Sequence, residues 1–156
     1  NSAAKQVLCQ NWSYTGSKSG DWVTSAQYFQ ALNGVSYFAP DLSIISLGIN
    51  DAIGAISPAT YASNMQTLIT TAKVSGSVIL YVPNPANTGD VAQYMPSLYA
   101  LAASNNVPIV DVYSRWGGTY TGATADGFMG VDSVHPNKPG VQDIANALFG
   151  FVMPRY

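Results

Sequence analysis

The single histidine of this 156-residue chain, His135, lies in the sequence Asp132-Ser133-Val134-His135-Pro136. An imidazole has an ordinary pKa that suits general acid–base catalysis near neutral pH, so His135 is the obvious candidate for a catalytic base. Asp132, three residues earlier, is close enough along the chain to orient the ring. A second polar sequence, Gly48-Ile49-Asn50-Asp51, follows an apolar segment far upstream. This combination predicts chemistry in which a base activates a nucleophile.

Each of these residues also has a structural interpretation. A lone histidine before a proline is often only a loop residue, and Asn50 could simply bridge a turn after a strand. Asp51 is expected to be structural, with its carboxylate bonded to backbone N–H groups in its own turn. Asp111 and Asp126 look like a strand-end residue and a loop residue. Only the combination of motifs, in this order along the chain, favours catalysis.

The composition narrows the possible functions. Charged residues make up 9% of the chain, far below the usual share of about 25%. The surface must therefore be largely neutral and polar, with many tyrosines, which suits an extracellular or virion-associated protein that meets carbohydrate. A general compositional bias of the source would have the same effect. The net charge is −2 and the sequence has no Lys/Arg cluster, which argues against nucleic-acid binding.

The residue types present also argue against a metal site. All eight acidic residues are aspartates, so mechanisms that need a glutamate, such as that of the HExxH metalloproteases, are excluded within these residues. One histidine and one cysteine cannot form a zinc site of the His/Cys kind. No apolar run approaches the roughly 20 residues of a membrane span. Cys9 is expected to be a buried strand residue.

The hydrophobic pattern alternates strands with helices along the whole chain. Expected strands are Val7–Asn11, Leu42–Leu47, Ser77–Val82 and Pro108–Val112, and expected helices are Asp21–Leu32, Ser57–Gly76, Asp90–Asn105 and a last one from about Asn137. Ser57-Pro58 is typical of a helix start, whereas Pro96 is expected to disturb its helix.

Residues 115–131 are rich in Gly and Thr and are expected to form a long loop. The last helix is expected to direct Val141, Ile144, Ala145 and Leu148 toward the core.

Strands separated by helices predict an α/β protein with a parallel sheet between two layers of helices. Residues 1–156 are expected to form one domain, since the chain has no internal repeat and no segment resembling a linker. Reactive groups of such folds gather beyond the carboxyl ends of the strands. Both Asn50 and the loop that carries Asp132 and His135 follow strands, which places them at that edge.

These residues resemble the motifs of the SGNH/GDSL-type serine hydrolases. The third block of that family is Gly-x-Asn-Asp, here Gly48 to Asp51, and the fifth is Asp-x-x-His, here Asp132 to His135. The second block supplies a glycine after the second strand, and Gly20 occupies that place. The resemblance spans nearly the whole chain, from Val7 to Leu148. It implies a three-layer α/β/α fold with a flavodoxin-like strand order 2-1-3-4-5.

The resemblance assigns roles to these side chains. His135 would take the proton of a serine hydroxyl, and Asp132 would hold the imidazole in the correct tautomer. The backbone N–H of Gly20 and the side-chain amide of Asn50 would bind the oxyanion of the tetrahedral intermediate. No metal or organic cofactor is implied. The substrate class is an O-acyl ester, and the neutral, tyrosine-rich composition favours an acetylated carbohydrate.

Three aromatic residues lie in the loop before His135, namely Trp116, Tyr120 and Phe128. They could stack on a substrate or merely pack the loop, and the sequence favours neither role. We therefore treat Trp116 and Tyr120 as possible substrate contacts.

The first block of the family, Gly-Asp-Ser, carries the nucleophile and does not occur in these 156 residues. In the family it precedes the second strand by one helix, and that second strand is predicted here at Val7–Asn11. Ser13, Ser17 and Ser19 lie beside Gly20, but this loop supplies an oxyanion donor in the family rather than the nucleophile. We therefore expect the serine to lie upstream of residue 1, on an N-terminal complementary polypeptide.

The physics of the sheet supports this expectation. In the implied strand order, the first strand lies between Val7–Asn11 and Leu42–Leu47, and its absence would leave both neighbours without a ladder of hydrogen bonds. Each buried unpaired backbone group costs about 1–3 kcal/mol, against a total stability of about 5–15 kcal/mol. A second interpretation is a catalytically degenerate member of the family that binds glycans or serves a structural role in a larger assembly.

Overall fold

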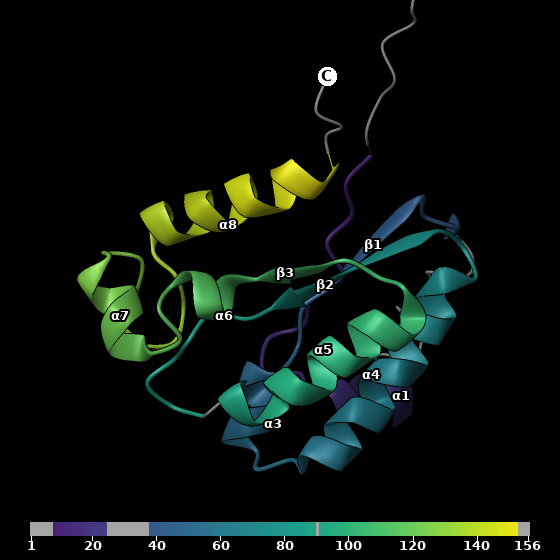
Figure 1. Ribbon diagram of the computed structural model, residues 1–156, viewed down its shortest axis with the longest axis horizontal. Helices are drawn as coiled ribbons and strands as arrows, with labels where there is room; N and C mark the ends of the chain where they lie inside the picture. The colour runs from purple at the N-terminus through teal and green to yellow at the C-terminus, as the bar shows by residue number, and fades with distance from the viewer. Residues whose placement is uncertain (1–7, 25–37, 90, 153–156) are drawn as a thin grey trace, which may run out of the picture.

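The centre of the sheet is β2 (Ser77–Val82), a strand of almost unbroken apolar residues. The computed structural model describes residues 8–24, 38–89 and 91–152 (Figure 1). β1 (Leu42–Ile45) and β3 (Ile109–Asp111) flank β2 and run parallel to it. Strands buried on both faces read as continuous apolar runs, which is why β2 was predictable. The predicted α/β class and parallel sheet are confirmed. In the family order 2-1-3-4-5, β1, β2 and β3 correspond to strands 3, 4 and 5.

The helices occupy the connections between the strands and the segments beyond them. They are α1 (Ser19–Thr24), α3 (Ile49–Ile53), α4 (Pro58–Lys73), the 3-10 helix η1 (Val91–Tyr94), α5 (Met95–Asn105), α6 (Val112–Arg115), α7 (Tyr120–Ala125) and α8 (Lys138–Val152). None of the helices in the described part of the chain is both long and apolar enough to span a bilayer.

Side chains of β2 alternate between two hydrophobic clusters, one on each face of the sheet. Val78, Leu80 and Val82 pack with α4 and α5, whereas Ile79 and Tyr81 pack with the second cluster, which includes Ile144 and Leu148 of α8. Figure 1 shows the same layering, with α1, α4 and α5 below the sheet and α8 above it. Because the two faces are covered by different helices, the sheet holds all of them in fixed relative positions.

Local signals place the helix starts. The Ser57 hydroxyl accepts a hydrogen bond from the Thr60 N–H, and Pro58 occupies the first turn of α4, as predicted. Pro96 lies in the first turn of α5, and the helix predicted from Asp90 to Asn105 is divided there into η1 and α5, in agreement with the expectation that Pro96 disturbs it. The predicted helix Asp21–Leu32 is seen as α1 as far as Thr24, and residues 25–32 lie outside the described residues.

The strand predicted at Val7–Asn11 is wrong over residues 8–11, which are not in a strand, and Val7 lies outside the described residues. The expectation that Cys9 is buried is also wrong, since Cys9 is exposed. A strand needs a neighbour to accept and donate its ladder hydrogen bonds. In the described part of the chain β1 pairs only with β2, so no ladder reaches this segment.

Two further predictions are corrected near the C-terminus. The long loop expected over residues 115–131 contains α7, which begins where the Thr119 hydroxyl accepts from the Gly122 N–H. On α8, Ile144 and Leu148 pack inward as predicted, but Val141 is 55% exposed and Ala145 is also exposed. The four-residue spacing of Val141 and Ala145 places them on a neighbouring face of the helix.

Asp143 of α8 links the last helix to the end of α6. Its carboxylate accepts hydrogen bonds from Arg115 Nε at 2.7 Å, Arg115 Nη2 at 2.6 Å and Trp116 Nε1 at 2.8 Å. Trp116 is fully buried, so its indole N–H has no access to water. The bond to Arg115, followed by that to Trp116, lowers the pKa of Asp143 below its ordinary value.

Replacing Asp143 with alanine is expected to lower the free energy of unfolding by about 1–3 kcal/mol, because it leaves the buried Trp116 N–H without an acceptor. Urea unfolding followed by tryptophan fluorescence measures this. Arg115→Met is the control and is expected to cost less than about 1 kcal/mol, as for an exposed ion pair. An equal loss in the two variants would contradict the importance of the indole.

The lowered pKa of Asp143 also determines the direction in which the stability of the protein changes with pH. The stabilisation from Asp143 is fully present above the ordinary carboxyl pKa, about 3.9, and is lost as the pH falls through the lower folded value.

Candidate active site

The Asp132–His135 turn is held by one carboxylate. Asp132 Oδ1 accepts from the backbone N–H groups of Val134 at 3.0 Å and His135 at 2.9 Å. Asp132 Oδ2 lies 2.6 Å from Nδ1 of the His135 ring. Ser133, between them, has a φ of 63°, a left-handed conformation that a tight turn can impose. The spacing of the motif therefore places the carboxylate on both the backbone and the ring of the histidine.

These contacts set the charge on Asp132. The backbone N–H of His135, its side chain and the backbone N–H of Val134 lower the pKa of Asp132 to about 2 from an ordinary value near 3.8. Asp132 is therefore an anion throughout the neutral range and can accept a hydrogen bond from the Nδ1–H of the ring. That arrangement leaves Nε2 of His135 to exchange protons with a reacting group. The His135 side chain is 76% exposed, so a substrate or another segment can reach it.

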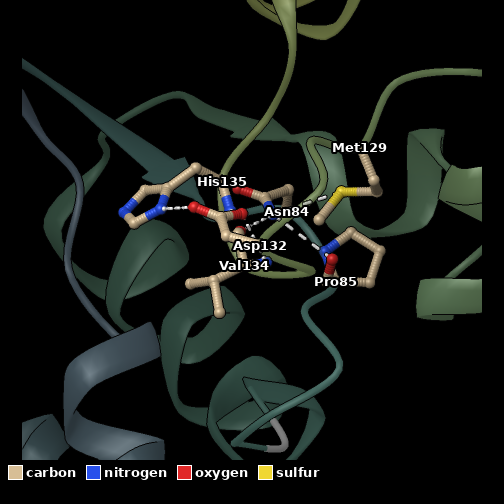
Figure 2. A network of polar contacts seen from close by, with 6 residues as sticks. All are labelled: Asn84, Pro85, Met129, Asp132, Val134 and His135. Carbon is tan, nitrogen blue, oxygen red and sulfur yellow. Dashed lines mark hydrogen bonds and ion pairs between the residues drawn. The ribbon is translucent and has the colours of Figure 1, made fainter.

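The remaining contacts of the turn come from distant segments. Asn84, just beyond β2, donates to the Val134 carbonyl at 3.0 Å, and the Asn87 N–H donates to the Ser133 carbonyl at 2.9 Å. Figure 2 shows the Asn84 amide on one side of the turn and the imidazole ring directed to the other side. Asn84 was not among the candidate residues expected from the sequence. Its position between two prolines at the end of an apolar strand was the available signal.

Asn50 lies at the start of α3, directly after β1. Its Nδ2 donates to the Ser17 carbonyl at 3.1 Å, which holds the segment before α1 beside it. Gly20 is the second residue of α1, and residues 14–20 are called the Gly20 loop below. A primary amide has two N–H donors, so a second one remains to bind an oxyanion. Gly48, before α3, has a φ of 141°, which L-residues rarely adopt, and a Cβ there would lie in ordinary contact with Pro83 at 3.4 Å. Gly48 thus permits the turn that positions Asn50.

Asp51 binds the same segment through its carboxylate. It is fully buried, and its carboxylate accepts from the Ser19 N–H at 3.0 Å and from the Ser19 hydroxyl at 2.5 Å. Asn64 of α4 donates to the same hydroxyl at 3.0 Å. Asp51 is therefore structural, as expected, but its hydrogen bonds reach a loop 32 residues away rather than its own turn. It therefore ties Ser19, the residue before Gly20, to the residue that follows Asn50.

The serines near Gly20 are occupied by structural contacts. The Ser17 hydroxyl donates to the Tyr14 carbonyl at 2.9 Å and accepts from Trp22 Nε1 at 3.2 Å. Ser19 is bound by Asp51, and both serines are buried. These contacts occupy Ser17 and Ser19, whereas Ser13 is exposed, and the expectation that this loop does not supply the nucleophile stays a prediction.

The segment after β2 contacts both motifs. Pro83 lies against Gly48, two residues before Asn50, and the next residue, Asn84, holds the backbone of the His135 turn. The carboxyl ends of neighbouring parallel strands meet at one edge of a sheet, which is where the sequence analysis placed both motifs.

Trp116 and Tyr120, the two possible substrate contacts, have different surroundings. Trp116 is fully buried against Phe128, with ring centroids 4.9 Å apart, and its N–H is bound by Asp143. It therefore packs in the core, which favours the second of the two roles that the sequence left open for it. Tyr120 is partly exposed, and its hydroxyl bonds Ser133 Oγ at 2.9 Å, so it lies against the turn that carries His135.

A groove of about 350 Å³ runs beside Asn50 along β1. Its lining comes from the segment before α1, α1, β1 and the turn after it, the start of α3, α4 and the end of β2, including Trp12, Tyr14, Ile44, Asn50, Leu68 and Pro83. Asp132 and His135 are not among its lining residues. Among the described residues, no group of three His, Cys, Asp or Glu side chains could hold a metal ion.

Comparisons with known proteins place most of this chain in one family. Residues 4–142 match the model of the GDSL-like lipase/acylhydrolase family. A search of curated proteins found no significant match.

Several solved structures share the fold. A lipase/acylhydrolase from Enterococcus faecalis superposes with a TM-score of 0.73 at 22% identity, over 90% of this chain and 75% of that chain. An acetyl xylan esterase superposes with a TM-score of 0.74 at 20% identity, over 88% of this chain and 77% of that chain. A peptidoglycan O-acetylesterase gives a TM-score of 0.69 at 16% identity, over 88% of this chain and 44% of that chain. At these identities the likeness is one of fold.

Proposed function

Because this chain belongs to the GDSL-like lipase/acylhydrolase family, we propose that it hydrolyses O-acyl esters with His135 as the general base. The observation that carries the proposal is the 2.6 Å contact between Asp132 Oδ2 and His135 Nδ1. In the proposed reaction, Nε2 of His135 takes the proton of a serine hydroxyl as the oxygen attacks the ester carbonyl. The same proton then passes to the departing alcohol, and water hydrolyses the acyl-serine by the reverse route.

The oxyanion of the tetrahedral intermediate would bind to Asn50 and Gly20. The Asn50 amide retains a donor after its bond to Ser17, and Asp51 holds the Gly20 loop beside it. Donors fixed in advance stabilise the developing charge without reorganisation, which is the usual source of a large rate effect.

The nucleophile in this proposal belongs to a segment outside these residues, since no Gly-Asp-Ser occurs among them. The edge of β1 supports this proposal. Among the described residues β1 pairs only with β2, and the groove beside it runs toward Asn50. A strand paired parallel to β1 would end near Asn50, so a serine following that strand would reach the proposed oxyanion donors.

The exposed face of α8 gives further support. Val141 and Phe149 are large exposed apolar residues eight positions apart on α8, and Ile44 of β1 is 46% exposed. Ile44 shares its face of the sheet with Leu42, which packs in the cluster under α8. A parallel strand added at β1 requires a crossover helix on one face of the sheet. A helix beside α8 would bury these side chains.

We propose an acetylated carbohydrate as the substrate and an extracellular location for the protein. The similar folds of an acetyl xylan esterase and a peptidoglycan O-acetylesterase support the substrate class. The low charge of the chain and its 10 tyrosines suit contact with neutral sugars, and Tyr120 is the tyrosine that bonds the His135 turn.

Labelling with a fluorophosphonate probe tests the proposal, because only an activated serine reacts. The complete polypeptide, with any residues encoded before Asn1, is expected to take up one equivalent of probe and to release acetate from acetylated xylo-oligosaccharides. His135→Ala is expected to abolish both. Absence of labelling in the folded protein would instead favour the second candidate, a degenerate module that binds glycans without cleaving them. Labelling with no acetate release would reject the carbohydrate ester and retain the serine.

A further inference from the structure

Asn84 is the buried polar residue that connects the sheet to the turn of the proposed base. It follows β2 by two residues and is 3% exposed. Its Nδ2 donates to the Val134 carbonyl at 3.0 Å and to its neighbour Pro85 at 3.2 Å, and it lies 3.7 Å from the Met129 sulfur. Burying an amide without a hydrogen bond costs free energy, so the Val134 carbonyl stabilises Asn84 at this position by accepting its N–H.

The carbonyl that Asn84 binds belongs to the peptide unit that joins Val134 to His135. The N–H of that same unit donates to Asp132 Oδ1 at 2.9 Å. Both polar groups of one planar peptide are therefore fixed, one by Asp132 within the turn and one by Asn84 from the sheet. The next carbonyl, that of His135, accepts from the Gly130 N–H at 2.8 Å.

The bond from Asn84 differs from the others in its origin. Asp132 and Gly130 belong to the same turn, so their bonds fix its shape but not its place on the sheet. Asn84 and the Asn87 N–H both reach the turn from the segment after β2. Of these two, only Asn84 acts on the peptide adjoining His135 and does so through a side chain that substitution can remove.

We propose that Asn84 is a positioning residue for His135. By holding the Val134–His135 peptide against the end of β2, it keeps the imidazole on Asp132 and directed to the side of the turn that faces away from Pro85 and Met129 (Figure 2). This inference rests on the proposed role of His135 as the base.

Asn84→Asp tests the inference in the complete polypeptide, since it preserves size and removes the donor. The imidazole ¹⁵N signals of His135, identified by their loss in His135→Asn, report which ring nitrogen carries the proton. We expect the Nδ1-protonated form to lose its dominance and kcat for p-nitrophenyl acetate to fall about tenfold or more, with KM within about twofold, as when only a transition-state interaction is lost.

Asn105→Asp is the matched control, because Asn105 Nδ2 also donates to a backbone carbonyl, that of Leu101 at 2.9 Å, far from the turn along the chain. It is expected to change neither the His135 signals nor kcat. Unchanged His135 signals in folded Asn84→Asp would overturn the inference. Asn84→Ala is the second variant, and failure of both variants to fold would also overturn it, by making Asn84 a requirement of the fold.

The nitrogen signals need neither the serine nor a substrate, which separates this inference from the proposed function. If they respond to Asn84→Asp while His135→Ala retains full turnover, the base has been misassigned and only the geometric role of Asn84 stands.

Discussion

Replacement of His135 with alanine is expected to lower kcat of the complete polypeptide for p-nitrophenyl acetate by about 10²–10⁴-fold, the usual contribution of a general base. The reason is that the 156 residues contain no second histidine that could replace His135 as the base. Initial rates at saturating substrate measure the effect.

The same variant should fold normally, because the His135 side chain is 76% exposed and contributes little to the core. Its thermal unfolding midpoint is therefore expected to match that of the parent protein within about 2–4 °C, the shift that about 1 kcal/mol produces in a domain of this size. Undiminished turnover in this variant would assign the base to another residue, whereas a large fall in the midpoint would attribute the lost rate to unfolding.

Asn50→Ala is expected to lower kcat by about 10²–10³-fold, or about 2.7–4 kcal/mol of transition-state stabilisation, as is typical for one oxyanion donor. KM should change little, because the negative charge that the amide binds develops only after the attack. Steady-state kinetics with an acetyl ester separate the two parameters.

The substitution also removes the hydrogen bond from Asn50 to the Ser17 carbonyl, so a control must separate loop position from charge stabilisation. Asn64→Ala removes a bond to the same loop, at Ser19, without removing a proposed oxyanion donor. It is expected to lower kcat by less than about tenfold. Equal losses in the two variants would mean that Asn50 acts only by holding the loop.

The elements that the sequence predicted well are those with strong local signals. The buried strand Ser77–Val82 and the helix after Ser57-Pro58 have the expected bounds at their starts, because a continuous apolar run and a capped first-turn proline depend on few neighbours. The strand at Val7–Asn11 was wrong over residues 8–11, because a strand depends on a partner that its own sequence does not specify.

The same distinction applies to the site. Asp132 and His135 are three residues apart, so their contact follows from local geometry and was predictable. Burial of Trp116 and its bond to Asp143 depend on α8, which is 27 residues away, and an aromatic residue in a glycine-rich segment does not reveal whether it faces substrate or core. Asn84 bonds a carbonyl 50 residues away, so its partner could not be assigned from the sequence, although its position between two prolines marked it.

The sequence by itself determined the chemistry that this chain can offer: one imidazole, a carboxylate within reach of it, and an amide after an apolar strand. Only the tertiary structure decided that Asp51 bonds the Gly20 loop and that Asn84 bonds the peptide before His135. The physical reason is that short-range contacts are fixed by the chain's own bond lengths and turn geometry. Contacts between distant segments exist only once the parallel sheet brings the ends of its strands together.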